Sequence, residues 1–333
     1  IMRAWTPPAA SVAASCSTKR WMSGQESWLR GAPGRAGTWS MPITARGGRI
    51  AGSESNTGLS ISKMDVRWAT VDDGSARVFS TRRSLARELR ELGVTPGDVL
   101  MVHASMRAVG EVLGGANVVV QALEDVVGEA GTLTAYVDVE LFHEDDDESE
   151  DVPVFDARIA RAARDHGILH EVMRTWPGAR RSAHPDAGVV AIGARAEWIV
   201  DPHPFRYGYG EGTPFARIVE AGGKVLMLGA PLDTITLVHH AEHLARIPDK
   251  RVVRYRRRML GREGVPEWVE FEEFETGDPV HESLPENCIE VIAEAYLASG
   301  RGRRGEIGKA PSYLFEGADL VRFAVEWLEE KLG

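Results

Sequence analysis

Hydrophobic positions in this sequence alternate between short continuous runs, typical of buried strands, and stripes at helical spacing. Leucines three and four positions apart share one face of a predicted helix that starts after Thr81 and ends at Gly93. The next apolar run, residues 99–103, suits a strand buried on both faces. The same reasoning predicts strands over 132–137, 189–192 and 224–228, and helices over 118–127 with an Asn117 cap, 159–175, 195–200, 214–220 and 236–247. This alternation predicts an α/β fold with a mainly parallel central sheet.

The pattern changes after residue 251. Residues 252–259 and 267–274 alternate apolar and charged positions on either side of the turn from Gly261 to Gly264, which is the signature of a β-hairpin. Two amphipathic helices, residues 288–297 and 319–332, are predicted to follow. The sequence therefore predicts a smaller antiparallel appendage in its C-terminal part.

Residues 1–75 are rich in Ser, Gly, Pro and Arg and sustain no period of 2 or 3.6 residues. Their bias toward Arg and Ser loosely resembles an organelle transit peptide. Internal methionines at Met22, Met41 and Met64 instead favour translated sequence upstream of the true start. We expect this segment to be disordered or extraneous, and residues 76–333 to form the functional domain.

Composition and net charge limit the classes of partner that the protein is expected to bind. The 333 residues are 43% hydrophobic and 26% charged, as in globular proteins, and no apolar run approaches the roughly 20 residues that span a bilayer. Residues 1–50 carry seven Lys or Arg and a single acid, so a net charge of −10 leaves −16 on residues 51–333. Such a field repels nucleic acid and anionic membranes and attracts cations. The two cysteines lack metal or redox spacing, which favours a reducing cytoplasm.

The densest cluster of ionisable side chains, residues 233–243, follows the predicted strand 224–228. His239 and Glu242 are three positions apart and share a helix face, so the carboxylate can accept the imidazole N–H and make the other ring nitrogen a better base. A lone histidine is more often structural than functional. Three histidines and two acids at a strand-to-helix junction, where α/β enzymes place their sites, favour catalysis. His243 is expected only to pack at the helix surface.

The same residues allow a second interpretation. His239, Glu242 and His243 spell H-x-x-E-H, the zinc motif of inverzincins, with the two histidines as ligands. The glutamates of residues 270–275 are numerous enough to supply a third ligand. A zinc-dependent hydrolase is therefore the alternative to metal-free base catalysis. The presence of both a base and an orienting carboxylate argues against a binding module without catalysis.

Two further regions carry candidate binding chemistry. The loop around Ser105 offers backbone amides, a hydroxyl and the cation Arg107 beside a helix start, although it is neither a P-loop nor G-x-G-x-x-G. Such a loop can hold a phosphate-bearing cofactor. Residues 144–151 hold seven acids in eight positions and, with the acids of 267–278, are expected to form two acidic walls for an amine-rich substrate.

Several longer strings stand out between residues 77 and 333, in chain order His103-Ala-Ser105-Met-Arg-Ala-Val-Gly110, Arg181-Ser182-Ala-His-Pro185, Tyr207-Gly-Tyr-Gly210, Leu226-Met-Leu-Gly-Ala-Pro-Leu-Asp233 and His239-His-Ala-Glu242. Together they closely resemble the aminoglycoside 3-N-acetyltransferases, most nearly the gentamicin-type branch. The resemblance implies an α/β/α sandwich that transfers acetyl from acetyl-coenzyme A to the 3-amino group of aminoglycoside antibiotics, without a metal. It also implies antibiotic resistance and a cytoplasmic protein, either a monomer or a homodimer.

The resemblance also assigns roles to individual residues. His239 would take the proton from the substrate amine, with Glu242 as its orienting partner. The substrate side would include Asp233, Tyr136 and Asp138, and we add Glu272 and Asp278 as carboxylates of an acidic wall. The coenzyme side would be lined by Ala104, Ser105, Arg107, Arg181 and Ser182, and we add the hydroxyl of Thr234 as a candidate donor to the reacting thioester.

Overall fold

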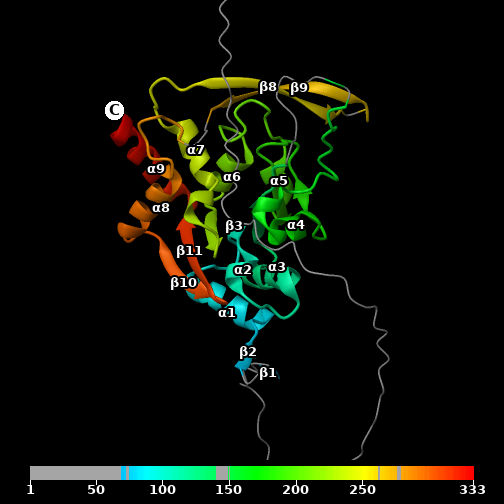
Figure 1. Cartoon of the computed structure of the whole chain (residues 1–333), viewed down its shortest axis with the longest axis vertical. Coiled ribbons are helices and arrows are strands. Elements are labelled where there is room, and N and C mark those ends of the chain that lie inside the picture. Colours follow the sequence, from blue (N-terminus) through cyan, green and yellow to red (C-terminus); the bar gives the residue numbers. More distant parts are fainter. Residues whose placement is uncertain (1–68, 73–74, 140–148, 150, 262, 276–278) are drawn as a thin grey trace, which may run out of the picture. The chain divides into compact units, whose positions relative to one another are not determined.

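A seven-stranded sheet organises the part of the chain that the computed structural model describes (Figure 1), which comprises residues 69–72, 75–139, 149, 151–261, 263–275 and 279–333. The predictions for residues 1–68, for the acidic run except residues 149 and 151, and for Asp278 lie outside the described residues. The first described elements are the paired strands β1 (Ala69–Asp72) and β2 (Ser75–Val78).

The central sheet is mixed. Strand β3 lies between β7 and β4 and is parallel to both, whereas the outer pairs β11–β7, β10–β11, β4–β6 and β5–β6 are antiparallel. The α/β class is confirmed, but the expected mainly parallel sheet is wrong, because only the two central pairs are parallel and the strands added on either side of them run antiparallel to their neighbours. In spatial order the strands are β10 (Arg303–Ile307), β11 (Ala310–Glu316), β7 (Lys224–Leu228), β3 (Val99–Ala104), β4 (Thr132–Tyr136), β6 (Val189–Gly193) and β5 (Arg180–Arg181).

Helices cover both faces of this sheet, as in an α/β/α sandwich. Along β3, Val99 and Met101 face one hydrophobic core, and Leu100 and Val102 face the other. The first core is completed by α5 (Ala196–Val200), α6 (Pro214–Glu220), α7 (Leu237–Leu244), α8 (Cys288–Ala298) and α9 (Gly317–Leu332). The second is completed by α1 (Arg82–Leu92), α3 (Gly115–Val127) and α4 (Ile168–Arg174). Because successive strand residues point to opposite faces, both cores need apolar side chains, which explains the continuous apolar runs.

Most predicted elements are confirmed to within a few residues. The predicted first helix is α1, whose Thr81 side chain caps the helix and which ends at Gly93 in a left-handed conformation. The Asn117 cap is wrong, because α3 starts at Gly115, three residues before the predicted start, with Gly114 as its N-cap. The helix predicted over 159–175 is also wrong in its first half, where only the 3₁₀ turn η1 (Arg164–His166) precedes α4. Gly167 separates the two with a φ of 81°.

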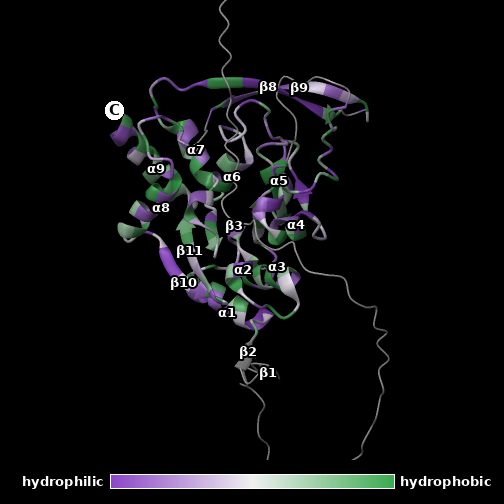
Figure 2. Cartoon of the chain, viewed as in Figure 1, coloured by the Kyte–Doolittle hydropathy of each residue, from purple (hydrophilic) through white to green (hydrophobic). Residues whose placement is uncertain are grey.

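The predicted antiparallel appendage is the hairpin of β8 (Val252–Leu260) and β9 (Pro266–Phe274). It lies at the top of Figure 1 and packs through a small third cluster that contains Phe155, Met259 and Phe271. The strands β10 and β11 were not predicted. Figure 2 shows why for β10, which is mostly hydrophilic and lies at the edge of the sheet.

No helix among the described residues is both long and apolar enough to cross a lipid bilayer.

Candidate active site

The cluster of residues 233–243 lies at the carboxyl edge of the three central strands. Strands β7, β3 and β4 lie side by side in that order and run parallel, so their C-terminal ends meet at one edge of the sheet. After β7 the chain turns at Gly229, where an added Cβ would lie 2.6 Å from the Cβ of Ala108 and 2.8 Å from that of Ala310. With a φ of 67°, this position requires glycine. The turn leads through the 3₁₀ turn η2 (Leu232–Thr234) into α7.

His239 and Glu242 form the pair that the sequence predicts. The Nδ1–H of His239 donates to Glu242 Oε2 over 2.7 Å, one helical turn apart on α7. The Glu242 side chain is 4% exposed and that of His239 is 23% exposed, so the carboxylate lies behind an imidazole that reaches solvent. This bond fixes the ring tautomer and leaves Nε2 as the nitrogen that accepts a proton.

Tyr209 contacts both His239 and the next residue, His240. Its ring centroid lies 5.1 Å from that of His239, and its backbone carbonyl accepts a 2.7 Å hydrogen bond from His240 Nδ1. Burial lowers the pKa of His240, in keeping with a neutral, structural imidazole. The hydroxyl of Tyr209 lies 2.8 Å from that of Tyr136, at the end of β4. The two tyrosines therefore form a continuous wall from β4 to the imidazole of His239.

This wall borders a cavity of about 640 Å³, which we call the central cavity. His239 lines this cavity, and so do six of the other residues that the sequence proposes for the site. They are Ala104, Ser105, Arg107, Tyr136, Asp233 and Thr234. The six come from the ends of β3, β4 and β7 and the turns that follow. Burial, with help from the charge of Glu290, raises the pKa of Asp233. The candidate base, four of the six candidate contacts for the coenzyme and two of the five for the amine substrate thus share one cavity.

Arg181 and Ser182 do not line this cavity. The Arg181 guanidinium donates to the carbonyl of Val137 over 2.6 Å and lies over the Phe155 ring, and burial lowers its pKa to about 10. Ser182 is buried, and its hydroxyl accepts a hydrogen bond from the amide of Val189. In this structure both residues support β6 and the loop after β4 and do not form the cavity wall.

Asp138 also lies outside the cavity wall, paired with a histidine that no sequence motif marks. Its Oδ1 pairs with Nε2 of His166, and its Oδ2 lies 3.4 Å from the Tyr136 hydroxyl. His166, on η1, lines the central cavity. Asp138 and His166 are 28 positions apart in the sequence. The spacing of residues on a helix or strand relates only positions a few residues apart, so it could not predict this contact.

The proposed contact of Glu272 with substrate is not supported by its surroundings. Its Oε1 accepts from Arg206 over 2.6 Å and its Oε2 from Arg254 over 2.8 Å, and these bonds lower the pKa of Glu272 to about 2. Arg254 is its directly opposed residue on β8. Two carboxylates of β9, Glu270 and Glu272, are therefore directly opposed by arginines of β8, so Glu272 is paired within the protein, and the acidic wall over residues 267–278 stays a prediction.

His243 is likewise not a surface residue. Its side chain is 4% exposed, and Nε2 lies 2.7 Å from Oε1 of Glu273. The rings of Tyr207 and Phe274 pack against it at centroid distances of 5.8 and 4.6 Å. The two histidines of the H-x-x-E-H string thus have different carboxylate partners, and the described residues contain no group of three or more His, Cys, Asp or Glu arranged to hold a metal ion.

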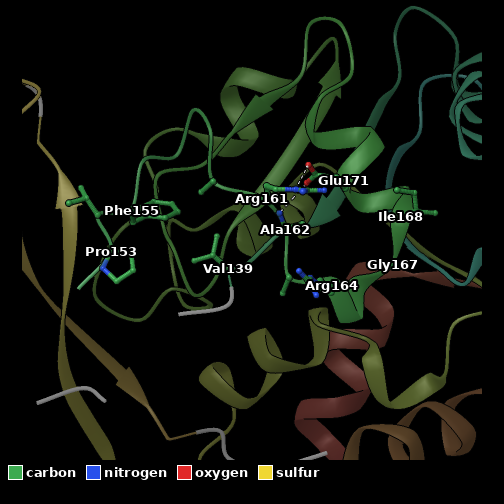
Figure 3. Close-up of a pocket in the computed structure, with 12 residues that line it drawn as sticks. Val139, Pro153, Phe155, Arg161, Ala162, Arg164, Gly167, Ile168 and Glu171 are labelled. Atoms are coloured by element: carbon green, nitrogen blue, oxygen red, sulfur yellow. Dashed lines mark hydrogen bonds and ion pairs between the residues drawn. The ribbon is translucent and has the colours of Figure 1, made fainter. Parts of the chain in front are cut away.

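A second cavity of about 470 Å³ adjoins the first (Figure 3). The two cavities share Arg164, Gly167 and Ile168, so η1 and the start of α4 form the partition between them. The remaining walls of the second cavity are largely apolar, apart from Arg161 and Glu171, whose side chains lie 3.3 Å apart.

An imidazole–carboxylate pair in a cavity at the carboxyl edge of a parallel strand trio is typical of an enzyme that removes a proton from its substrate. Comparison with known proteins specifies the class. Residues 101–329 match the family model of aminoglycoside 3-N-acetyltransferase. The aminoglycoside N(3)-acetyltransferase III of Pseudomonas aeruginosa is 45% identical over 262 residues, which cover 76% of this chain and 95% of that protein.

Solved structures agree. A structure described as AAC-IIIb binary with CoASH is 50% identical with a TM-score of 0.74, over 77% of this chain and 98% of that one. One described as AAC-VIa bound to sisomicin is 38% identical with a TM-score of 0.71, over 77% of this chain and all of that one. This chain belongs to the aminoglycoside 3-N-acetyltransferase family.

Proposed function

We propose that this chain transfers the acetyl group of acetyl-coenzyme A to the 3-amino group of aminoglycosides, with His239 as the general base, and thereby confers resistance. The observation that carries this proposal is the His239–Glu242 pair, whose imidazole lines the central cavity while its carboxylate lies behind it. Residues 76–333 would form the working domain, and no metal would take part. The proposal includes a cytoplasmic location, where acetyl-coenzyme A is available.

The chemistry needs a base because an aminoglycoside amine is mostly protonated near neutral pH. In the proposed reaction, the ammonium first releases one proton to solvent; Nε2 of His239 then takes a second proton from the neutral amine nitrogen as the nitrogen lone pair forms a bond to the thioester carbonyl carbon. The C–S bond of the resulting tetrahedral species then breaks, its electron pair leaves on sulfur, and the imidazolium returns the proton to the thiolate. Glu242 stabilises the imidazolium between these steps.

The two substrates would enter from different sides of the central cavity. Ala104 ends β3, and Ser105 and Arg107 follow it and offer a hydroxyl and a cation to the coenzyme. Thr234 would donate to the thioester oxygen. Asp233 supplies a carboxylate for a substrate amine at the same cavity.

The geometry of the H-x-x-E-H string does not support a zinc-dependent hydrolase. Zinc bound by the H-x-x-E-H string would need His239 and His243 on one ion, whereas His243 is buried against Glu273. Family membership also favours the acyl transfer.

The test is thiol release from acetyl-coenzyme A in the presence of aminoglycosides with and without an unsubstituted 3-amino group. We expect turnover only with the first set, unaffected by a chelator. Turnover independent of the 3-amino group, or lost with the chelator, would refute the assignment.

A further inference from the structure

A second histidine–carboxylate pair faces the central cavity, formed by His166 and Asp138. It resembles the His239–Glu242 pair in that His166 lines the cavity and its carboxylate partner, Asp138, does not, although the Asp138 side chain is 28% exposed and that of Glu242 only 4%. The His166 side chain is 18% exposed, and that of His239 is 23% exposed. The cavity therefore has two imidazoles in its wall, each held by a carboxylate.

The two imidazoles lie at opposite ends of the tyrosine wall. The ring of His166 meets that of Tyr136 edge-on at 5.0 Å between centroids, and Tyr136 reaches His239 through Tyr209. His166 also belongs to η1, whose first residue, Arg164, lines both cavities (Figure 3). It is thus held on the partition between the cavities, away from the catalytic base.

The charged surroundings of His166 favour its protonated form. Burial opposes this by lowering its pKa, but the hydrogen bond and the charge of Asp138, with a smaller effect of Asp165, raise the pKa above the ordinary value of 6.5. The titratable groups that face His166 from its own and the packed elements are Asp138 and Tyr136 near β4, Asp165 on η1, His103 on β3 and His170 on α4. Of these, burial lowers the pKa of both His103 and His170, so they stay neutral.

An imidazolium selects between the two substrates, because it repels ammonium groups and donates to phosphate and carbonyl oxygens. Its neighbours in the cavity wall include the cations Arg107 and Arg164 and the hydroxyl of Ser105. We propose that His166 is a further binding residue of this enzyme, a cavity-facing imidazolium that donates to oxygen acceptors of acetyl-coenzyme A, with Asp138 as its positioning residue. This rests on the proposed use of the central cavity for the coenzyme. It also changes the role of Asp138, which then orients His166 and does not bind a substrate amine.

The test is calorimetric titration of the full-length protein with coenzyme A, from about pH 6 to about pH 9, together with KM for an aminoglycoside. We expect wild-type affinity for coenzyme A to fall as pH rises through the pKa of His166, because the imidazolium is lost. His166→Asn should weaken binding at neutral pH by about tenfold and remove this fall, with the aminoglycoside KM changed less than about twofold.

Asp138→Asn should lower the pKa of His166, so the fall in coenzyme A affinity should begin at lower pH. Matched controls are His281→Asn and Asp125→Asn, whose parent residues bond Ser283 and Arg82 and do not line the central cavity. Unchanged affinity in His166→Asn would overturn the inference, as would an Asp138→Asn variant that raises only the aminoglycoside KM. If the variants fail to fold, the wild-type protein alone tests the inference, and a coenzyme A affinity that does not change with pH would overturn it. Wild-type protein that binds coenzyme A without acetylating aminoglycosides would instead refute the proposed function.

Discussion

Nε2 of His243 on α7 lies 2.7 Å from Oε1 of Glu273 on β9, so the helix that carries His239 contacts the hairpin. The other oxygen of Glu273 accepts the amide of Gly208 over 2.7 Å, so one carboxylate joins the helix, the hairpin and the loop before Tyr209. The base is therefore held in place by contacts outside its own helix.

His243→Ala is predicted to destabilise the fold by about 2 kcal/mol, because it leaves a buried carboxylate without its imidazole and opens a gap between aromatic rings. Thermal or denaturant unfolding measures this. His243→Gln, which retains a donor, should recover part of the loss, and His281→Ala serves as the control. Unchanged stability in His243→Ala would show that the contact contributes nothing.

Glu272→Gln is predicted to leave the aminoglycoside KM unchanged and to alter stability at acid pH. The pKa of Glu272 is lowered in the folded protein to about 2 from its ordinary 4.5, so its contribution is fully present above pH 4.5 and is lost as pH falls toward 2. The variant should therefore show a smaller loss of stability than wild type over this window. A large rise in KM would restore Glu272 as a substrate contact.

Ionic strength is predicted to raise KM for the aminoglycoside while kcat changes little, because salt screens the attraction between the acidic protein and a polycation. Replacing the acids of residues 144–151 by Asn and Gln should produce the same rise at low salt. The same exchange at Glu270, whose directly opposed residue is Arg256, should not. A KM that is independent of salt would exclude steering.

Removal of residues 1–68 is predicted to leave activity and thermal stability nearly unchanged, since their sequence lacks the apolar periodicity needed to pack against a core. Activity and melting temperature of the shortened and full-length chains would be compared. A marked loss of either would assign this segment a structural role.

Most elements of the sandwich and the contact between His239 and Glu242 could be predicted from the sequence, because both depend on local spacing. Residues three apart on a helix must share a face, which is why His239 and Glu242 could be paired in advance. Asp138 and His166 could not, since their contact depends on where β4 ends and where Gly167 interrupts the predicted helix. The ion pair of Glu272 with Arg254 could not be predicted either, because it depends on the register of the hairpin, which places Arg254 directly opposite Glu272 and Arg256 opposite Glu270.

Replacement of the base tests the central claim most directly. Because general-base catalysis contributes about 10²-fold to 10⁴-fold, the turnover number of His239→Ala in acetyl transfer should fall by that factor, with coenzyme A affinity retained. Glu242→Gln should lose somewhat less, since the imidazole remains but is no longer oriented by a charge, and His281→Ala should match wild type. The account predicts a His239→Ala turnover number at least about 10²-fold below that of wild type, and a value within about tenfold of wild type would contradict it.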